Sequence, residues 1–285
     1  MKIYLAGGIT GNLISLWKEI MRIYLAGTYS RKYCIEEAMK VYLAGDNGKY
    51  SGTYDEEIEK HKPYILESYY YIRNNEEWIM EMRPYFKGFL LDSGAFTFLN
   101  SGGKINWEQY VREYAEFINK HEVELFFELD IDPIVGLKEV ERLRDLLEEL
   151  TNKKCIPVWH KSRGMDYWEK MVQEYDYVAI GGIVTKEIKP KDYPIFSVLI
   201  KIASQHKCKV HGLGFTNMDG LRKYKFYSVD STAWLYGNRG GFLYQFNGTK
   251  LDKIQPKNMR LKGRQAAIHN FTEWLKFSHY ADRNL

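Results

Sequence analysis

The stretch Gly88–Phe96, which reads GFLLDSGAF, is the best guide to the fold of this chain. An apolar run that leads straight into Asp92 is typical of a strand buried on both faces. The small residues Ser93, Gly94 and Ala95 follow, and they allow a tight turn and a close approach to the backbone. The pattern therefore places a carboxylate where a buried strand ends. An Asp at such a position also commonly caps the next loop or helix.

Similar apolar runs recur along the chain and alternate with amphipathic segments. The predicted strands are Leu125–Asp130, Cys155–His160, Tyr177–Gly182, Lys209–Gly214 and Phe226–Thr232, with a further buried segment at Tyr64–Arg73 and a further strand candidate at Phe242–Phe246. The predicted helices lie at 107–118, 137–150, Met165–Tyr175, Ile195–Ser204, Met218–Tyr224 and Arg264–His279, with an acidic helix that ends by Met82.

The N-terminus carries a repeat, at Met1–Gly7, Met21–Gly27 and Met39–Gly45. Each copy reads as a short strand that ends in glycine, and we expect one or two copies to join the main sheet. Strands that alternate with helices indicate a parallel sheet with right-handed crossovers. We therefore expect an α/β fold, a (β/α)8 TIM-like barrel, formed by residues 1–285 as a single domain with an N-terminal strand repeat (1–50) and a basic C-terminal segment (249–285). A doubly wound open sheet is the alternative.

Composition is ordinary for a soluble globular protein, with 45% hydrophobic and 27% charged residues. No apolar run approaches the roughly 18 residues of a membrane helix, and no signal-peptide pattern opens the chain. The isolated cysteines Cys34, Cys155 and Cys208 form neither a disulfide framework nor a CxxC metal site, so we expect a cytoplasmic protein. Residues 201–264 hold 13 Lys and Arg against 3 Asp and Glu, although the net charge of the whole chain is only +4. This basic region predicts a polyanionic partner.

In a barrel, the C-terminal ends of the strands meet at one mouth. Those ends carry ionisable groups or bare glycine backbone, namely Asp92, Asp130, His160, Gly181-Gly182, His211-Gly212-Leu213-Gly214 and Asp230. One interpretation is a Mg²⁺ or Mn²⁺ site, but Asp132, one of its ligands, precedes Pro133 and is typical of a turn. The other is glycosyl transfer, in which one carboxylate attacks or stabilises the sugar carbon and a second carboxyl group moves a proton.

The ordered motifs LLDSGAF, LFFELD, IPVWH, AIGGI, HGLGF and SVDST resemble the tRNA-guanine transglycosylase superfamily over residues ~64–240. The chain looks most like its phage DNA-guanine transglycosylases, which insert 7-deazaguanine derivatives into DNA. The resemblance implies that Asp230 is the nucleophile and Asp92 the general acid/base. It also implies a base pocket formed by Asp130, His160, Gly181, Gly182, Gly212 and Gly214. To this predicted pocket we add Ser93 and Gly94, which directly follow Asp92. The tRNA enzymes carry Gln where this chain has His160.

Two departures from the tRNA enzymes favour the DNA branch. Their Cys-Cys-Cys-His zinc site follows the barrel, but this chain has no cysteine beyond Cys208, and Asp230 is followed by STAWLYG rather than Pro-Thr-Arg. We expect no metal and no cofactor, and we expect DNA and a free 7-deazaguanine base as partners. The predicted phosphate contacts are Arg239, Lys250, Lys253, Lys257, Arg260, Lys262 and Arg264.

Two other functions stay open from the sequence. The KIYLAG start is similar to nucleoside deoxyribosyltransferases, so an N-glycosidase or deoxyribosyltransferase that acts on free nucleosides is one alternative. It would use the same carboxylates but would not need the basic segment. The other alternative is a catalytically silent barrel that binds nucleic acid.

Overall fold

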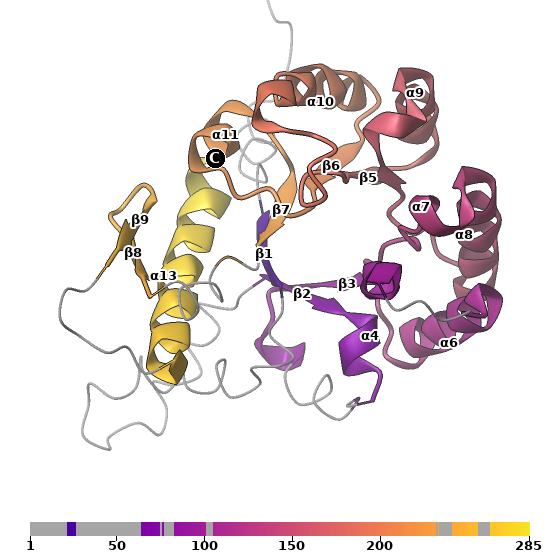
Figure 1. Ribbon diagram of the computed structural model, residues 1–285, viewed down its shortest axis with the longest axis horizontal. Coiled ribbons are helices and arrows are strands. Elements are labelled where there is room, and N and C mark those ends of the chain that lie inside the picture. The colour runs from indigo at the N-terminus through magenta and orange to yellow at the C-terminus, as the bar shows by residue number, and fades with distance from the viewer. Residues whose placement is uncertain are drawn as a thin grey trace, which may run out of the picture.

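The computed structural model describes residues 22–26, 64–74, 76, 83–100, 105–231, 233, 241–255 and 263–285. Within these residues the strands form a ring, and helices surround it on the outside (Figure 1). No helix in these ranges combines the length and the apolar character that a bilayer-spanning segment requires. The first and third copies of the N-terminal repeat lie outside the described residues, as does nearly all of the predicted helix that ends by Met82.

The main sheet is parallel throughout, with the order β3-β2-β1-β7-β6-β5-β4. Its strands are β1 (Arg22–Ala26), β2 (Tyr64–Ser68), β3 (Gly88–Asp92), β4 (Val158–Trp159), β5 (Tyr177–Ile180), β6 (Lys209–Gly212) and β7 (Ser228–Ser231). β1 is the second copy of the repeat, and it pairs with both β2 and β7. The first and last strands are therefore neighbours, and a repeat copy joins the sheet as predicted.

The two edges of this sheet are joined by residues 125–128. Parallel bridges link Leu91 to Phe126 and Phe127 to Ile156, just before β4. The amide of Phe127 donates to the carbonyl of Leu91 at 2.9 Å, and the amide of Ile156 donates to the carbonyl of Phe126 at 2.8 Å. This segment is the eighth parallel element, so each element is bonded to the next along the chain and the last to the first. The fold is the predicted (β/α)8 barrel rather than an open sheet.

The barrel interior is a separate apolar core. Because successive side chains of a strand point to opposite faces, every second residue faces the inside. The buried members of this inner core are Tyr64, Leu66, Leu90, Phe127, Ile156, Val158, Tyr177 and Ala179. Two residues beyond Leu66, Leu90 and Val158, the inward positions are Ser68, Asp92 and His160. The inner face thus changes from apolar to polar at the C-terminal ends of the strands.

A larger core lies between the strands and the outer helices. The helices are α4 (Tyr69–Ile72), α6 (Trp107–Lys120), α7 (Asp132–Val135), α8 (Leu137–Thr151), α9 (Met165–Glu174), α10 (Ile195–Gln205), α11 (Met218–Lys223) and α13 (Gly263–Asn284). Asn106 caps α6 by accepting from the Gln109 amide at 3.1 Å, which satisfies one of the unpaired donors of its first turn. The helices predicted from residue 107 onward are confirmed, and α13 runs five residues beyond the predicted end at His279.

The predicted strand at Phe242–Phe246 forms, but outside the barrel. β8 (Leu243–Phe246) pairs antiparallel with β9 (Leu251–Ile254). This hairpin packs on α13, where the amide of Tyr244 donates to Asn270 Oδ1 at 2.7 Å and the amide of Phe246 donates to Glu273 Oε2 at 2.7 Å. Part of the basic segment is therefore an antiparallel hairpin anchored on the terminal helix (Figure 1).

A buried carboxylate fixes the joint between residues 125–128 and β4. Glu128 is fully buried, and its Oε1 accepts from the Val158 amide at 2.7 Å. The guanidinium groups of Arg163 and Arg144 donate to Glu128 Oε1 and Oε2, each at 3.2 Å. Burial raises the pKa of Glu128, and the two arginines oppose that rise. The charges compensate one another, as a buried charge requires.

We expect the substitution Glu128→Gln to lower the free energy of unfolding by roughly 2–4 kcal/mol, because it leaves two buried guanidinium groups short of a charge partner. Urea unfolding followed by circular dichroism measures the change. The matched control is Glu139→Gln, which removes an exposed carboxylate from a 2.8 Å pair with Arg142 and should change stability little. Equal losses in the two variants would contradict a special role for the buried group.

Candidate active site at the mouth of the barrel

Asp92 ends β3 and begins a turn that only glycine permits. Its Oδ2 accepts from the Gly94 amide at 2.9 Å. Gly94 has a φ of +72°, and a Cβ there would lie 2.4 Å from Tyr70 Cβ and 2.5 Å from Ser68 Oγ. Glycine is therefore required here for two reasons: it adopts the left-handed backbone conformation, and its missing side chain lets the end of β2 come close. The predicted carboxylate stands at a rigid strand end.

Tyrosines of α6 hold the same strand end from outside. The Tyr110 hydroxyl donates to the carbonyl of Ser93 at 2.6 Å, and the Tyr114 hydroxyl donates to the carbonyl of Leu91 at 3.1 Å. Ser93 is buried, and its Oγ accepts from the Ala95 amide at 3.4 Å. The Ser93 side chain supports the turn, and its contact with a base stays a prediction.

Three predicted carboxylates act on one another at the mouth. Burial raises the pKa of Asp92 from 3.8 to about 6. The Gly94 amide opposes this rise, and the negative charges of Asp130 and Asp230 add to it. The strand ends are thus close enough for mutual repulsion, and Asp92 is left able to exchange a proton near neutral pH.

Asp230, in β7, is held by two donors on the same oxygen. Its Oδ1 accepts from the Gly214 amide at 2.6 Å and lies 3.2 Å from His211 Nε2. The residue is largely buried. Its other oxygen, Oδ2, makes no hydrogen bond to any residue that the structure describes. Among the described residues, only Oδ1 of Asp230 is therefore hydrogen-bonded.

His160 bridges two carboxylates across the mouth. Its Nε2 lies 2.6 Å from Asp130 Oδ1, and its Nδ1 lies 3.0 Å from Glu187 Oε2. Burial lowers the pKa of His160, but the two carboxylates outweigh it and raise that pKa to about 9. A protonated imidazole can donate from both nitrogens, which matches the two acceptors. Asp130 and His160 therefore come together as predicted, as an ion pair.

Asp130, Asp132 and His160 each offer one possible metal-ligand atom, and these three atoms lie within 4.8 Å of one another, which is close enough to hold a metal ion. Each already has a partner. Arg163 Nε donates to Asp132 Oδ1 at 2.9 Å, and the same guanidinium reaches Asp132 Oδ2 at 2.5 Å. A cation would have to break this pair and the His160–Asp130 bond, so the group fits an ion-pair network better than a metal site.

Gly181 and Gly182 make room for the His160–Glu187 pair. A Cβ on Gly181 would lie 2.8 Å from His160 Cε1, and one on Gly182 would lie 2.8 Å from Glu187 Oε2. Gly182 also has a φ of +79°. The sequence explains these glycines as a backbone platform for a base, and the structure adds a packing reason for both.

Gly212 and Gly214 differ in what they face. A Cβ on Gly212 would lie 3.1–3.2 Å from Phe215 and Phe226, which are buried core residues. Gly214 has a φ of +67°, a Cβ there would lie 2.4 Å from Val184, and its amide binds Asp230. Gly214 is thus part of the site. Gly212 packs against the core, so only its backbone N–H and C=O could contact a base, and that contact stays a prediction.

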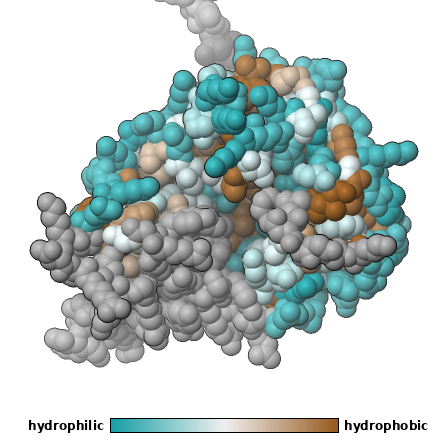
Figure 2. Space-filling view, viewed as in Figure 1, coloured by the Kyte–Doolittle hydropathy of each residue, from teal (hydrophilic) through white to brown (hydrophobic). Residues whose placement is uncertain are grey.

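Only part of the predicted phosphate-binding set falls on described residues. Lys250 and Lys253 are exposed on the β8–β9 hairpin, where Lys250 Nζ lies 3.6 Å from Asp252 and Lys253 Nζ lies 4.9 Å from the ring centre of Phe242. Arg264 falls in the first turn of α13. The other predicted contacts, Arg239, Lys257, Arg260 and Lys262, lie outside the described residues. On the face shown in Figure 2, the coloured residues are mostly hydrophilic.

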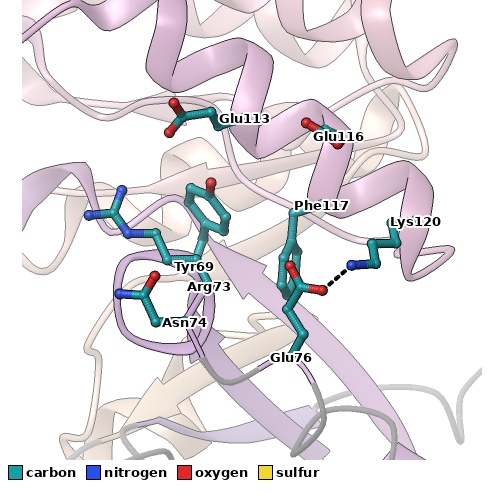
Figure 3. A pocket seen from close by; sticks show the side chains of 8 residues that line it. All are labelled: Tyr69, Arg73, Asn74, Glu76, Glu113, Glu116, Phe117 and Lys120. Carbon is teal, nitrogen blue, oxygen red and sulfur yellow. Dashed lines mark hydrogen bonds and ion pairs between the residues drawn. The ribbon is translucent and has the colours of Figure 1, made fainter.

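A separate pocket of about 320 Å³ lies between the end of α4 and α6 (Figure 3). It is lined by Tyr69, Arg73, Asn74, Glu76, Glu113, Glu116, Phe117 and Lys120, none of which was predicted as a site residue. Lys120 pairs with Glu76 at its rim. The guanidinium of Arg73 lies 5.9 Å from the ring centre of Tyr69, so these two lining residues contact each other.

Sequence reasoning missed two residues that the structure brings into the site. His211 was seen only as part of the HGLG strand end, yet it contacts Asp230 directly. Its position on β6, two residues after Lys209 in the inward alternation, is the signal that could have found it. Glu187 lies in the loop after β5, and no periodic pattern marks it.

No family model matches this sequence, and no curated protein matches it either. Among solved structures, the chain is similar to a protein from Coccidioides immitis described as a fructose-1,6-biphosphate aldolase, with a TM-score of 0.55 and 11% identity over 95% of this chain and 94% of that one. This likeness shows the fold alone.

Two further structures have TM-scores below 0.5. The carboxyl transferase domain of Rhizobium etli pyruvate carboxylase has a TM-score of 0.46 at 14% identity, over 100% of this chain and 55% of that one. The HpcH/HpaI aldolase of Desulfitobacterium hafniense DCB-2 has a TM-score of 0.43 at 12% identity, over 80% of this chain and 93% of that one. Neither bears on the chemistry of the mouth.

We expect Asp92→Asn to stabilise the protein at pH 7–8 by roughly 1–3 kcal/mol. Because the folded state raises the pKa of Asp92 from 3.8 to about 6, the wild type binds this proton more tightly when folded, and its stability falls as pH rises from about 4 to about 6. The variant lacks that loss, so its advantage should vanish at pH 4. Thermal melts at pH 4 and pH 7.5 measure the difference.

The control for this test is Asp145→Asn on α8, an exposed carboxylate whose replacement should leave the melting temperature nearly unchanged at both pH values. A gain for Asp92→Asn that is the same at pH 4 and pH 7.5 would show that the charge of Asp92 costs the fold nothing.

Proposed function

We propose that this chain is a DNA base transglycosylase that exchanges guanine in DNA for a 7-deazaguanine derivative such as preQ0. The exchange proceeds through a covalent bond between Asp230 and the sugar. The observation that carries the proposal is that Asp92, whose pKa is raised to about 6, shares the mouth with Asp230, whose Oδ2 makes no hydrogen bond to any described residue. One group is suited to move a proton and the other to attack, which is the division of labour that sugar transfer needs.

The first half of the reaction removes guanine. A guanine nucleotide unstacks into the mouth, at a cost of about a few kcal/mol. Asp230 Oδ2 forms a bond to C1′ while the C1′–N9 bond breaks, and Asp92 gives its proton to the departing base. The donors on Oδ1, the Gly214 amide and His211, fix the orientation of the attacking carboxylate.

The second half is the reverse with a different base. A 7-deazaguanine enters the pocket, Asp92 takes the proton from its ring nitrogen, and that nitrogen attacks C1′ to release Asp230. One glycosidic bond replaces another, so the chemistry needs no oxidant, reductant or nucleoside triphosphate. Asp130 and His160 supply a fixed pair of polar groups for the edge of the base, since His160 holds Asp130 at 2.6 Å.

We expect Asp230→Ala to abolish the exchange of isotopically labelled guanine out of a DNA duplex, because no covalent intermediate can form. Mass spectrometry of the digested nucleosides measures both the lost guanine and the inserted 7-deazaguanine. The Asp145→Asn variant serves as the active control. Full exchange by Asp230→Ala would rule out this residue as the nucleophile.

The same experiment separates the two alternatives. Denatured samples of wild type with DNA should contain a covalent protein–DNA adduct that Asp230→Ala lacks. Turnover of free nucleosides without a DNA adduct would favour the N-glycosidase or deoxyribosyltransferase. DNA binding with neither adduct nor turnover would favour the silent barrel.

DNA binding should weaken steeply with salt, because phosphate contacts release counterions. We expect the double variant Lys250→Ala, Lys253→Ala to lower the slope of log K against log salt by about 1–2, since each lost phosphate contact removes roughly 0.9. Fluorescence anisotropy at several salt concentrations measures this slope. Lys170→Ala on the exposed face of α9 is the control and should leave it unchanged. A slope that does not differ between the two variants would place the DNA elsewhere.

A further inference from the structure

A chain of hydrogen bonds leads from the barrel interior to Asp230. The hydroxyl groups of Tyr177 and Ser228 are bonded to each other. Ser228 Oγ lies 2.6 Å from His211 Nδ1, and His211 Nε2 lies 3.2 Å from Asp230 Oδ1. His211 is completely buried, with the ring centre of Phe127 at 5.3 Å. Strands β5, β6 and β7 each contribute to this chain.

The chemistry of the groups gives each bond a direction. A carboxylate only accepts, so the bond to Asp230 requires a proton on His211 Nε2. A neutral imidazole then accepts at Nδ1, and the Ser228 hydroxyl donates its proton there. The Ser228 oxygen in turn accepts from the Tyr177 hydroxyl. With a neutral ring, every donor therefore points towards Asp230, and in either charge state the bond to Asp230 requires a proton on Nε2.

We propose that His211 is a positioning residue that selects which oxygen of Asp230 attacks the substrate. The Gly214 amide and the His211 Nε2–H both donate to Oδ1, which leaves Oδ2 as the oxygen that bonds to the reacting carbon. Identifying that carbon as a sugar C1′ rests on the proposed function. The orientation of the carboxylate by His211 does not, because it follows from the contacts of Asp230 alone.

Two substitutions at the same position separate positioning from packing. The side-chain amide of Gln reaches about as far as His Nε2, whereas that of Asn reaches only about as far as Nδ1. His211→Gln therefore keeps a donor for Asp230, and His211→Asn keeps only the contact with Ser228. We expect His211→Asn to lower kcat by about 10- to 100-fold with KM nearly unchanged, and His211→Gln to restore kcat to within several-fold of wild type.

A spectroscopic readout on the wild type needs no substrate. Two-dimensional ¹⁵N NMR of the histidine rings reports which nitrogen carries the proton. We expect Nε2 of His211 to carry a proton at pH 7, because it faces a carboxylate oxygen. Loss of its cross-peaks in His211→Gln assigns the signal, and Ser228→Ala provides the assignment if that variant does not fold.

The outcomes keep this inference distinct from the proposed function. A ring without a proton on Nε2, or equal kcat losses in His211→Asn and His211→Gln that follow their melting temperatures, would overturn the positioning role even if base exchange occurs. The Nε2–H tautomer in a protein that exchanges no base would uphold the orientation of Asp230 and reject the transglycosylase proposal.

Discussion

The hydrogen bonds that residues 125–128 make to β3 on one side and to the start of β4 on the other join the edges of the strand ring. Without this joint, Asp92 at the end of β3 and His160 at the end of β4 would stand on opposite edges of an open sheet. The buried Glu128 network strengthens the same joint by tying the segment to the Val158 amide and to two arginines. The grouping of the mouth residues is therefore a result of closure, and the short segment is the element on which closure depends.

Closure also sets the electrostatics of the mouth. Carboxylates that are far apart in sequence are brought close together. Burial, with the negative charges of Asp130 and Asp230, raises the pKa of Asp92 towards neutrality. His160 relieves part of that repulsion by pairing with Asp130 and Glu187. Asp92 and Asp230 differ in their surroundings, because Asp92 accepts from the Gly94 amide whereas Asp230 contacts both the Gly214 amide and His211.

The strands and most helices could be predicted from the sequence, because apolar alternation and amphipathic spacing are local signals. The strand ends at Asp92, Asp130, His160 and Asp230 followed from those patterns together with the geometry of parallel barrels. Side-chain partners could not be predicted in the same way. The contact of His160 with Glu187 spans 27 residues and that of His211 with Asp230 spans 19, and both depend on the rotation of loops and side chains. The strand at Phe242–Phe246 was predicted, but its antiparallel partner β9 was not, because a lone strand pattern does not reveal what it pairs with.

The gathering of three carboxylates at the mouth also acts as an electrostatic filter. Such a surface repels phosphate groups. Under the proposed function, the exposed lysines of the β8–β9 hairpin offer the opposite charge for a nucleic-acid backbone. An uncharged planar ring meets no such barrier. A positive charge that develops on a sugar carbon inside the mouth would even be attracted by it. The charges at the mouth thus disfavour anionic groups and favour uncharged rings and cationic centres.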